Sequence, residues 1–131
     1  MSLDFAPPAD GVVTSPFGMR KHPILDSRRL HSGADFAGGS AVRAGASGTV
    51  VRAAFDVAYG NYVVVLHGQN AGRSVATLYA HCASLDVAMG DRVRTGEVLG
   101  QIGDTGYSTG PHLHFELRLD GRPVDPLPYI R

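Results

Sequence analysis

Two histidines separated by one residue, His112 and His114, are the clearest chemical feature of this sequence. They open the run HLHFELRL (112–119), whose composition predicts a β-strand. Residues two apart on a strand project from the same face, so both imidazoles would address one point. This spacing is that of a metal or catalytic site, although two histidines on a polar sheet face would give the same pattern.

A third histidine precedes an aspartate by four residues, in His31-Ser32-Gly33-Ala34-Asp35. The small residues between them would let both side chains turn toward one centre. Zinc accepts imidazole nitrogen and carboxylate oxygen, and a catalytic zinc site typically has three protein ligands and a water. Two ligands from this segment and one from the histidine pair would complete that count. A histidine and an aspartate four apart are, however, also common without a metal.

A fourth histidine, His81, follows the alternating residues 74–80, where a predicted strand gives way to a loop. A histidine held at such a point could act as a general acid or base, because the unperturbed pKa of imidazole lies near neutrality. In isolation it would more often be a surface residue. We expect its neighbour Cys82 to pack as a small hydrophobic residue, although a thiolate there could compete for zinc.

The rest of the chain must position these residues, and its pattern predicts a mainly β protein. Seventeen glycines and eight prolines separate short valine-rich runs, which is typical of many strands joined by turns. No stretch keeps an apolar period of 3.6 for more than two turns, so helix should be scarce, with at most a short helical turn at 83–87. The expected strands are 49–57, 61–67, 74–80, 98–102 and 112–119.

The segment 20–30 contains Pro23 and clustered charges without alternation. We therefore expect an exposed loop that leads into His31 and forms part of a cleft wall. Length and composition indicate one domain, which we place at 11–131 after an extended, loosely held arm at 1–10. Residues 1–3 look like a remnant of cloning.

Composition narrows the classes of partner and compartment. Twelve basic and twelve acidic residues cancel, so there is no electrostatic case for binding nucleic acid or an anionic membrane surface. A single cysteine excludes an internal disulfide and does not reveal the redox compartment. No apolar run approaches the roughly 20 residues of a membrane span, and the N-terminus lacks a secretory signal pattern. We expect the chain to be cut from a longer precursor that carried its address.

Taken together, these elements resemble the lysostaphin/LytM-type zinc metallopeptidases, which are peptidoglycan endopeptidases. The resemblance is carried by His31-x-x-x-Asp35, by Tyr79-Ala80-His81 and by Gly110-Pro111-His112-Leu113-His114-Phe115-Glu116, in that order. Shorter matching pieces extend it over nearly the whole chain, at 15–20, 48–51, 59–62, 90–96 and 106–110.

The resemblance implies a compact antiparallel, sandwich-like β domain, the duplicated hybrid motif, with long loops forming an active-site groove. It also implies one zinc ion per chain bound by His31, Asp35 and His114, with His81 and His112 as catalytic residues beside the open position. The reaction would be peptide hydrolysis by a metal-activated water. One of the two histidines would act on that water and the other on the oxyanion or leaving amine, and the sequence does not say which.

The implied substrate is peptidoglycan, in its cross-links or stem peptides, at an extracellular or periplasmic location. We expect a monomer without nucleic-acid or membrane contacts. Four loop residues could line the substrate groove or simply make turn hydrogen bonds: Asn61, Tyr107, Ser108 and Thr109. His22 and His67 match none of the family positions. We expect His22 to be a loop residue that borders the groove and His67 to be a strand-end residue.

Four rival functions fit the sequence less well. A non-catalytic member of the fold, binding cell-wall peptides or regulating a hydrolase, would usually lose ligands, and all five histidine and aspartate positions are filled here. The segment 90–100 resembles biotinyl and lipoyl carrier domains, but the only lysine, Lys21, lies far from it. A structural zinc site normally has four protein ligands. A serine or cysteine hydrolase lacks support, because there is no Gly-x-Ser-x-Gly elbow and the adjacent side chains of His81 and Cys82 would diverge on a strand.

Overall fold

The computed structural model is built around one large antiparallel sheet. It describes residues 3–21 and 28–131, and for residues 19–21 and 28–30 it describes the backbone alone. Within this part of the chain the sheet has ten strands, and its continuous path runs β1-β4-β11-β8-β7-β6-β9. Along this path the strands are β1 (Val12–Ser15), β4 (Ala34–Ala37), β11 (Leu113–Leu119), β8 (Arg73–Leu85), β7 (Gly60–Asn70), β6 (Gly48–Asp56) and β9 (Arg92–Val93).

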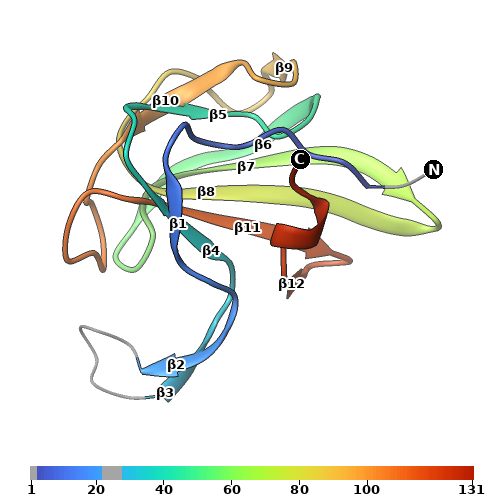
Figure 1. Cartoon of the computed structure of the whole chain (residues 1–131). Helices are drawn as coiled ribbons and strands as arrows, with labels where there is room; N and C mark the ends of the chain where they lie inside the picture. Colours follow the sequence, from blue (N-terminus) through green and yellow to red (C-terminus); the bar gives the residue numbers. More distant parts are fainter. Residues whose placement is uncertain (1–2, 22–27) are drawn as a thin grey trace.

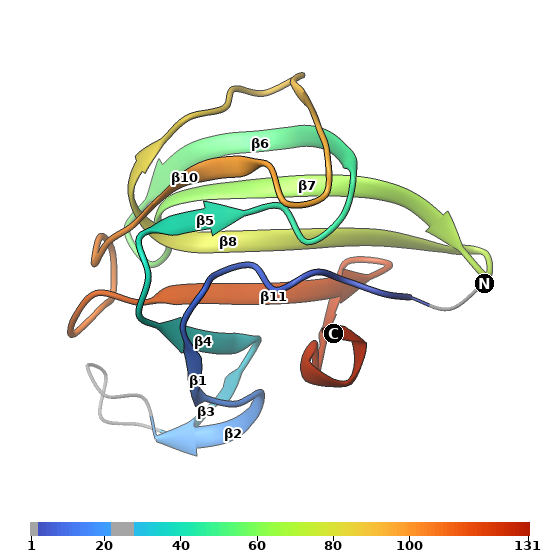
Figure 2. The same ribbon diagram turned by 45° about the horizontal axis from the view of Figure 1, so that its top comes forward.

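Further strands add a second layer and an outlying ribbon. β10 (Val98–Ile102) pairs with both β8 and β5 (Ala41–Arg43), and Figure 2 shows β5 and β10 lying across one face of the long strands. β12 (Arg122–Val124) pairs with β11. β2 (Gly18–Lys21) and β3 (Arg28–His31) form a separate two-stranded sheet that projects from the body beyond β1 and β4 (Figure 1). This arrangement confirms the expected mainly β, antiparallel fold class.

The main core lies between the long strands and the β5–β10 layer. Period-two alternation turns one set of side chains into this core and leaves the next set on the opposite face. Burying a large apolar side chain contributes roughly 1.5–3 kcal/mol relative to leaving it exposed, so the inner face stabilises the sheet and the outer face can carry polar groups. The inner set includes Val42, Val50, Val63, Val65, Tyr79, Leu99, Leu113 and Phe115.

The expected strands agree with the structure to within a few residues, except at the end of β8. That strand does not stop at Ala80 but continues to Leu85, so the helical turn expected at 83–87 is wrong. Beyond His81, β8 leaves β11 and pairs with β10, whose main-chain groups bond those of residues 82–85. A single helical turn would have offered fewer hydrogen bonds for the same ordering of the backbone.

Helix is scarce, as expected, in the part of the chain that the structure describes. It is limited there to one 3₁₀ turn, η1 (Leu127–Tyr129). No helix among the described residues is long and apolar enough to cross a membrane.

The loop expected at 20–30 is wrong at both of its ends, because β2 and β3 pair there in an antiparallel register from Gly18↔His31 to Lys21↔Arg28. Main-chain pairing of two strands does not depend on the alternation of side chains, so the sequence pattern did not indicate these strands. His22 lies outside the described residues, as does the rest of the segment 22–27.

The sequence suggested an extended, loosely held arm at the N-terminus. The segment is extended, but it packs against the domain and is not loosely held. Phe5 is buried in a small cluster with Val75, Leu117 and Leu119. Its N–H donates to the Tyr129 carbonyl at 2.8 Å, and the Pro8 carbonyl accepts from the Arg43 N–H at the same distance. Burial of the Phe5 ring and these main-chain hydrogen bonds together offset the entropy that the segment loses when it is ordered. The domain boundary at residue 10 stays a prediction.

His67 lies inside β7 and not at the strand end expected for it. Its Nδ1 donates to the Ser47 carbonyl at 2.8 Å, which leaves Nε2 to accept from the Thr77 hydroxyl at 2.7 Å. Thr77 in turn accepts from the Tyr79 hydroxyl, which accepts from the Gly45 N–H. Burial lowers the pKa of His67, so a neutral ring fits this chain of hydrogen bonds, and the residue has a structural role.

Two glycines with positive φ let the turn after β6 pack against the loop between β10 and β11. Gly60 has φ 67° and Gly106 has φ 76°. A Cβ on Gly106 would lie 2.3 Å from the Gly60 nitrogen and 2.5 Å from the Ala58 carbonyl oxygen. The turn carries Tyr59 and the loop leads to His112, so this backbone contact sets the spacing of two parts of the site described below.

We predict that Gly106→Ala lowers the melting temperature by roughly 10 °C, because the left-handed strain of alanine adds to a backbone clash. Gly72→Ala is the matched control: its φ is 80° but nothing lies within 4 Å of the added Cβ. We expect that control to lose only about 4 °C. Equal losses in calorimetry would contradict the close packing of the two segments.

Candidate metal centre and its surrounding histidines

Three buried side chains from three strands meet at one point. His31 ends β3, Asp35 lies on β4 and His114 lies on β11 directly opposite Asp35 in the strand pairing. Their exposed fractions are 5%, 8% and 6%. One candidate ligand atom from each lies within 4.8 Å of the other two. The strand register therefore brings together the three residues proposed as ligands.

The orientation of these side chains fits a divalent metal ion. Asp35 Oδ1 lies 3.1 Å from His31 Nε2 and 3.0 Å from His114 Nδ1. On the far side of the first ring, His31 Nδ1 donates to the Pro16 carbonyl at 2.7 Å, so Nε2 is the atom that faces the centre. Two imidazole nitrogens and a carboxylate oxygen form the donor set of a three-ligand zinc site.

The tight path from His31 to Asp35 depends on a glycine. A Cβ on Gly33 would lie 2.1 Å from the Phe115 carbonyl oxygen, so only glycine lets this segment pass so close to β11. Ala34, which follows, is fully buried. The small residues between His31 and Asp35 thus let this segment lie close to β11, and they also let both ligand side chains turn toward one centre.

His81 lies beside this cluster in an unusual backbone conformation. Its φ is 66°, a left-handed value that costs a non-glycine residue on the order of 1 kcal/mol. The Tyr59 carbonyl accepts from its N–H at 2.7 Å, and the Thr105 carbonyl accepts from its Nδ1 at 2.7 Å. Burial lowers the pKa of His81 to about 4. The ring is therefore neutral near pH 7, with Nε2 available to accept a proton.

His112 lies next to His81 and is the most exposed ring of the site. The two ring centres are 4.8 Å apart, and His112 Nε2 lies 3.8 Å from Asp35 Oδ2. Its Nδ1 is 2.9 Å from the Gly110 carbonyl oxygen, to which it donates, and 3.1 Å from the Ser108 hydroxyl. His81 and His112 thus both donate Nδ1–H to a main-chain carbonyl beside the three-residue cluster.

Electrostatic interactions link the side chains of the cluster. Burial alone would raise the pKa of Asp35, but hydrogen bonds from His114 and His31 hold it well below its usual range. Burial would likewise lower the pKa of His114, yet its hydrogen bonds to Asp35 and Glu116 outweigh burial and raise that pKa to about 9. His114 is therefore an imidazolium between two carboxylates. A metal ion must displace its Nδ1 proton in order to bind.

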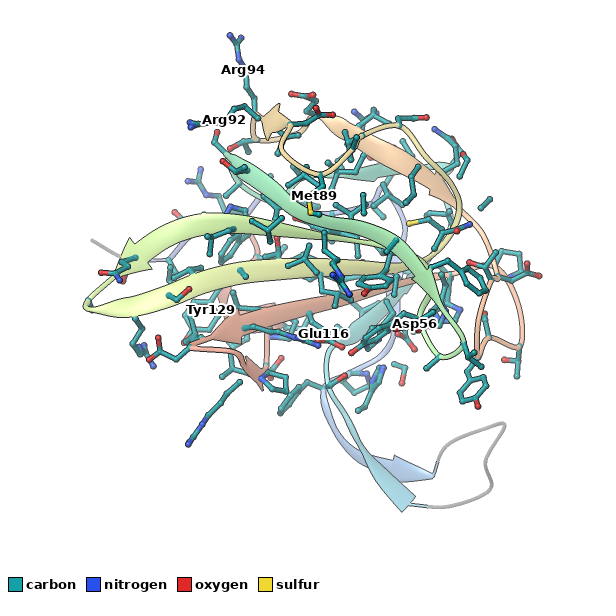
Figure 3. The ribbon with its side chains drawn as sticks, turned by 180° about the vertical axis from the view of Figure 1, so that it is seen from behind. Asp56, Met89, Arg92, Arg94, Glu116 and Tyr129 are labelled. Atoms are coloured by element: carbon teal, nitrogen blue, oxygen red, sulfur yellow. The ribbon has the colours of Figure 1, made fainter. Side chains whose placement is uncertain are left out.

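Sequence reasoning assigned no role to Glu116, which the structure places behind His114. Figure 3 shows Glu116 on β11, and its side chain is fully buried. Its Oε2 accepts from His114 Nε2 at 2.8 Å, from the Ser32 hydroxyl at 2.7 Å and from the Tyr59 hydroxyl at 2.6 Å. Arg118 Nε donates to Oε1 at 2.7 Å. The available signal was the spacing, because Glu116 follows His114 by two and must share its face.

The four proposed groove residues lie in different surroundings. Asn61 Nδ2 donates to the Cys82 carbonyl at 3.1 Å, and its N–H donates to the Thr105 hydroxyl at 3.1 Å. Ser108 contacts His112, as described above. Tyr107 and Thr109 are exposed on the loop before His112. Roles of these residues toward a substrate stay predictions.

Cys82 packs in the main hydrophobic core and is fully buried. Burial raises the pKa of its thiol to about 12, so it stays protonated and is a poor metal ligand or nucleophile. Among the described residues, the cluster able to hold a metal does not include it.

Comparison with known proteins places this geometry in a family. The model of "Peptidase family M23" matches residues 29–126. A DD-carboxypeptidase/endopeptidase, Mpg, of Neisseria meningitidis serogroup B is 48% identical over 117 residues, which cover 88% of this chain and 26% of that protein. The peptidoglycan DD-endopeptidase ShyA of Vibrio cholerae is 39% identical, with 86% of this chain and 26% of that protein covered. The chain thus spans about a quarter of the length of these relatives.

Solved structures share the fold over almost the whole chain. A zinc-containing peptidase from Vibrio cholerae superposes with a TM-score of 0.80 at 32% identity, covering 95% of this chain and 39% of that one. The catalytic domain of the antimicrobial peptidase lysostaphin from Staphylococcus simulans superposes with a TM-score of 0.78 at 30% identity, covering 92% of each chain. The resemblance inferred from the sequence motifs is thereby confirmed.

The raised pKa of His114 yields a prediction about metal uptake. We expect the affinity for added zinc to rise by about tenfold per pH unit between pH 6.5 and 9, because one Nδ1 proton must leave, and to level off above pH 9. Competition with a calibrated chelator measures this dependence. The proton on His114 also stabilises the fold when no zinc is bound. This contribution is complete below about pH 6.5 and is lost as the pH rises through 9, so the free energy of unfolding without zinc should fall over that range. An affinity independent of pH would contradict the hydrogen-bonded imidazolium.

Proposed function

We propose a function on the premise that this chain belongs to peptidase family M23. The domain is a zinc-dependent endopeptidase that hydrolyses peptide bonds in peptidoglycan cross-links or stem peptides. The observation that carries this proposal is the meeting of His31, Asp35 and His114 with two further histidines beside them. The relatives support the same reading, since one is named a peptidoglycan DD-endopeptidase and a similar structure is described as zinc-containing.

The three-residue cluster would hold the zinc ion through His31 Nε2, the Asp35 carboxylate and His114 Nδ1. Zinc bound by three protein ligands lowers the pKa of a coordinated water and polarises a substrate carbonyl. The two ring nitrogens are supplied by histidines whose opposite nitrogens are already hydrogen-bonded, to Pro16 and to Glu116. The site is therefore built for three ligands, which favours a catalytic role over a purely structural one.

His81 and His112 supply the proton transfers. Each donates Nδ1–H to a carbonyl oxygen, which leaves an Nε2 lone pair that can take a proton from the attacking water. The ring that has accepted the proton becomes an imidazolium, and its Nε2–H can then be donated to the leaving amine. The other ring can hydrogen-bond the oxyanion when it is protonated. Main-chain acceptors hold both rings in place, so little reorganisation is needed during the reaction.

The substrate class sets the place of action. Peptidoglycan lies outside the cytoplasm, so the domain works in an extracellular or periplasmic location. All five site residues come from one chain, so no second copy is needed to complete the site, and we propose that the domain acts as a monomer. A binding-only module of the same fold is the rival proposal, and the complete set of five residues favours hydrolysis over it.

We predict that His81→Ala retains about one zinc per chain and loses peptidoglycan hydrolysis by at least about 100-fold, since a general acid–base contributes 10²–10⁴-fold. His114→Ala should instead lose most of its zinc, because a ligand is removed. Elemental analysis of freshly purified protein gives the zinc content. Mass spectrometry of peptides released from purified peptidoglycan, with and without a chelator, gives the activity.

Three results would count against this account. Equal zinc loss in both variants would refute the division into ligand and proton-transfer residues. Zinc binding without chelator-sensitive peptide release by the unchanged chain would favour the binding-only module. Failure of the unchanged chain to take up zinc would remove the basis of the proposal.

A further inference from the structure

We infer that Glu116 is a positioning residue for the metal centre: its carboxylate holds the His114 ring so that Nδ1 faces the metal, and it strengthens that nitrogen as a ligand. The inference rests on the proposed function only in that a metal ion is bound by His114. It concerns a residue outside the cluster of ligands and outside the pair of catalytic histidines.

The strand itself places Glu116 behind His114. On β11, residues 114, 116 and 118 alternate with the buried Phe115 and Leu117, so the three polar side chains share the face opposite the core. The exposed fraction of Glu116 is 0%. A buried carboxylate without partners would cost several kcal/mol, so its retention here requires compensating hydrogen bonds.

The Glu116 carboxylate is the acceptor in each of those hydrogen bonds. Oε2 accepts from His114, Ser32 and Tyr59, and Oε1 accepts from Arg118. Arg118 Nη2 also donates to the Tyr59 hydroxyl at 3.0 Å, which orients that hydroxyl to donate its own proton to Glu116. Arginine can only donate, so the direction of the network is fixed. Glu116 therefore acts as an acceptor toward His114.

An acceptor at this position determines which nitrogen of His114 carries the proton. With Nε2–H donated to Glu116, Nδ1 is the atom left for a metal, and it lies 3.0 Å from Asp35 Oδ1 at the centre. The ring also stacks on Tyr59, with centroids 5.9 Å apart and planes 24° apart, which restricts its rotation. Orientation and tautomer are thus set by the same small group of residues.

Among the four histidines of the site, His114 differs from the other three in the charge of the group that accepts its outer ring N–H. His31, His81 and His112 donate to the neutral main-chain carbonyls of Pro16, Thr105 and Gly110. A carboxylate partner makes imidazole a more basic ligand than a carbonyl partner does, and removing such a partner typically costs 10–100-fold in metal affinity. The structure places this stronger partner behind a proposed metal ligand and not behind either proton-transfer histidine.

The test is the zinc dissociation constant of the full chain carrying Glu116→Gln, measured by competition with a chromophoric chelator. Glutamine keeps the size of the side chain, but its amide N–H groups would face donors that the carboxylate now satisfies. We expect the dissociation constant to rise by about 10–100-fold. Glu97→Gln is the matched control, because Glu97 is the other glutamate of the chain and its carboxylate accepts an exposed hydrogen bond from the Arg94 N–H, away from the metal centre. Its dissociation constant should stay within about twofold of the unchanged chain.

Two further readouts separate positioning from a merely structural role. In the cobalt-substituted protein, Glu116→Gln should shift the visible absorption bands of the metal, whereas Glu97→Gln should not. Tyr59→Phe removes one donor to Glu116 and keeps the ring, so it should raise the zinc dissociation constant by a few-fold, and it serves if Glu116→Gln does not fold. A lower melting temperature of metal-free Glu116→Gln with an unchanged zinc affinity and cobalt spectrum would overturn the inference.

Failure of the inference about Glu116 can be told apart from failure of the proposed function, because zinc binding is measured without peptidoglycan. If the unchanged chain binds zinc and releases no peptides, the proposed hydrolysis fails, and the role of Glu116 is still decided by the two Gln variants. If the unchanged chain binds no zinc, both proposals are overturned.

Discussion

The antiparallel pairing of β4 with β11 is the constraint on which the site depends. It sets His114 directly opposite Asp35, and the alternation of β11 then places Glu116 behind the same ring. The same alternation buries Leu113, Phe115 and Leu117, so the strand that carries the metal ligand is anchored by the core. A one-residue slip in register would exchange the two faces, removing the ligand and exposing the core together. Stability and function are therefore linked in this strand.

Close backbone contacts and one strained residue complete the arrangement. Gly33 lets the His31–Asp35 segment lie against β11, and Gly106 lets the loop before His112 lie against the turn at Tyr59. His81 takes a left-handed conformation where β8 changes partner from β11 to β10. Strain of this kind persists only where the surroundings over-determine it, and hydrogen bonds to Tyr59 and Thr105 do so here. The ring is thereby held beside His112.

The sequence predicted features that depend on local spacing and missed those that depend on distant partners. The shared face of His112 and His114 follows from strand alternation, and the pairing of His31 with Asp35 follows from small residues between them. The continuation of β8 to Leu85 depends on β10, which lies far along the chain, and the burial of Phe5 depends on β8 and β11. Glu116 was missed because a glutamate on a polar strand face is usually solvated. The spacing places it beside His114, but its burial depends on partners far along the chain, Ser32 and Tyr59.

The central claim is that His31, Asp35 and His114 together hold one zinc ion, with His114 binding through Nδ1. Anomalous diffraction at the zinc absorption edge, from a crystal grown with zinc, tests this most directly. The account predicts one strong peak about 2.0–2.2 Å from His31 Nε2, an Asp35 oxygen and His114 Nδ1, with His114 Nε2 still on Glu116. A peak bound through His81 or His112 in place of His114, or no ordered peak at this cluster, would contradict it.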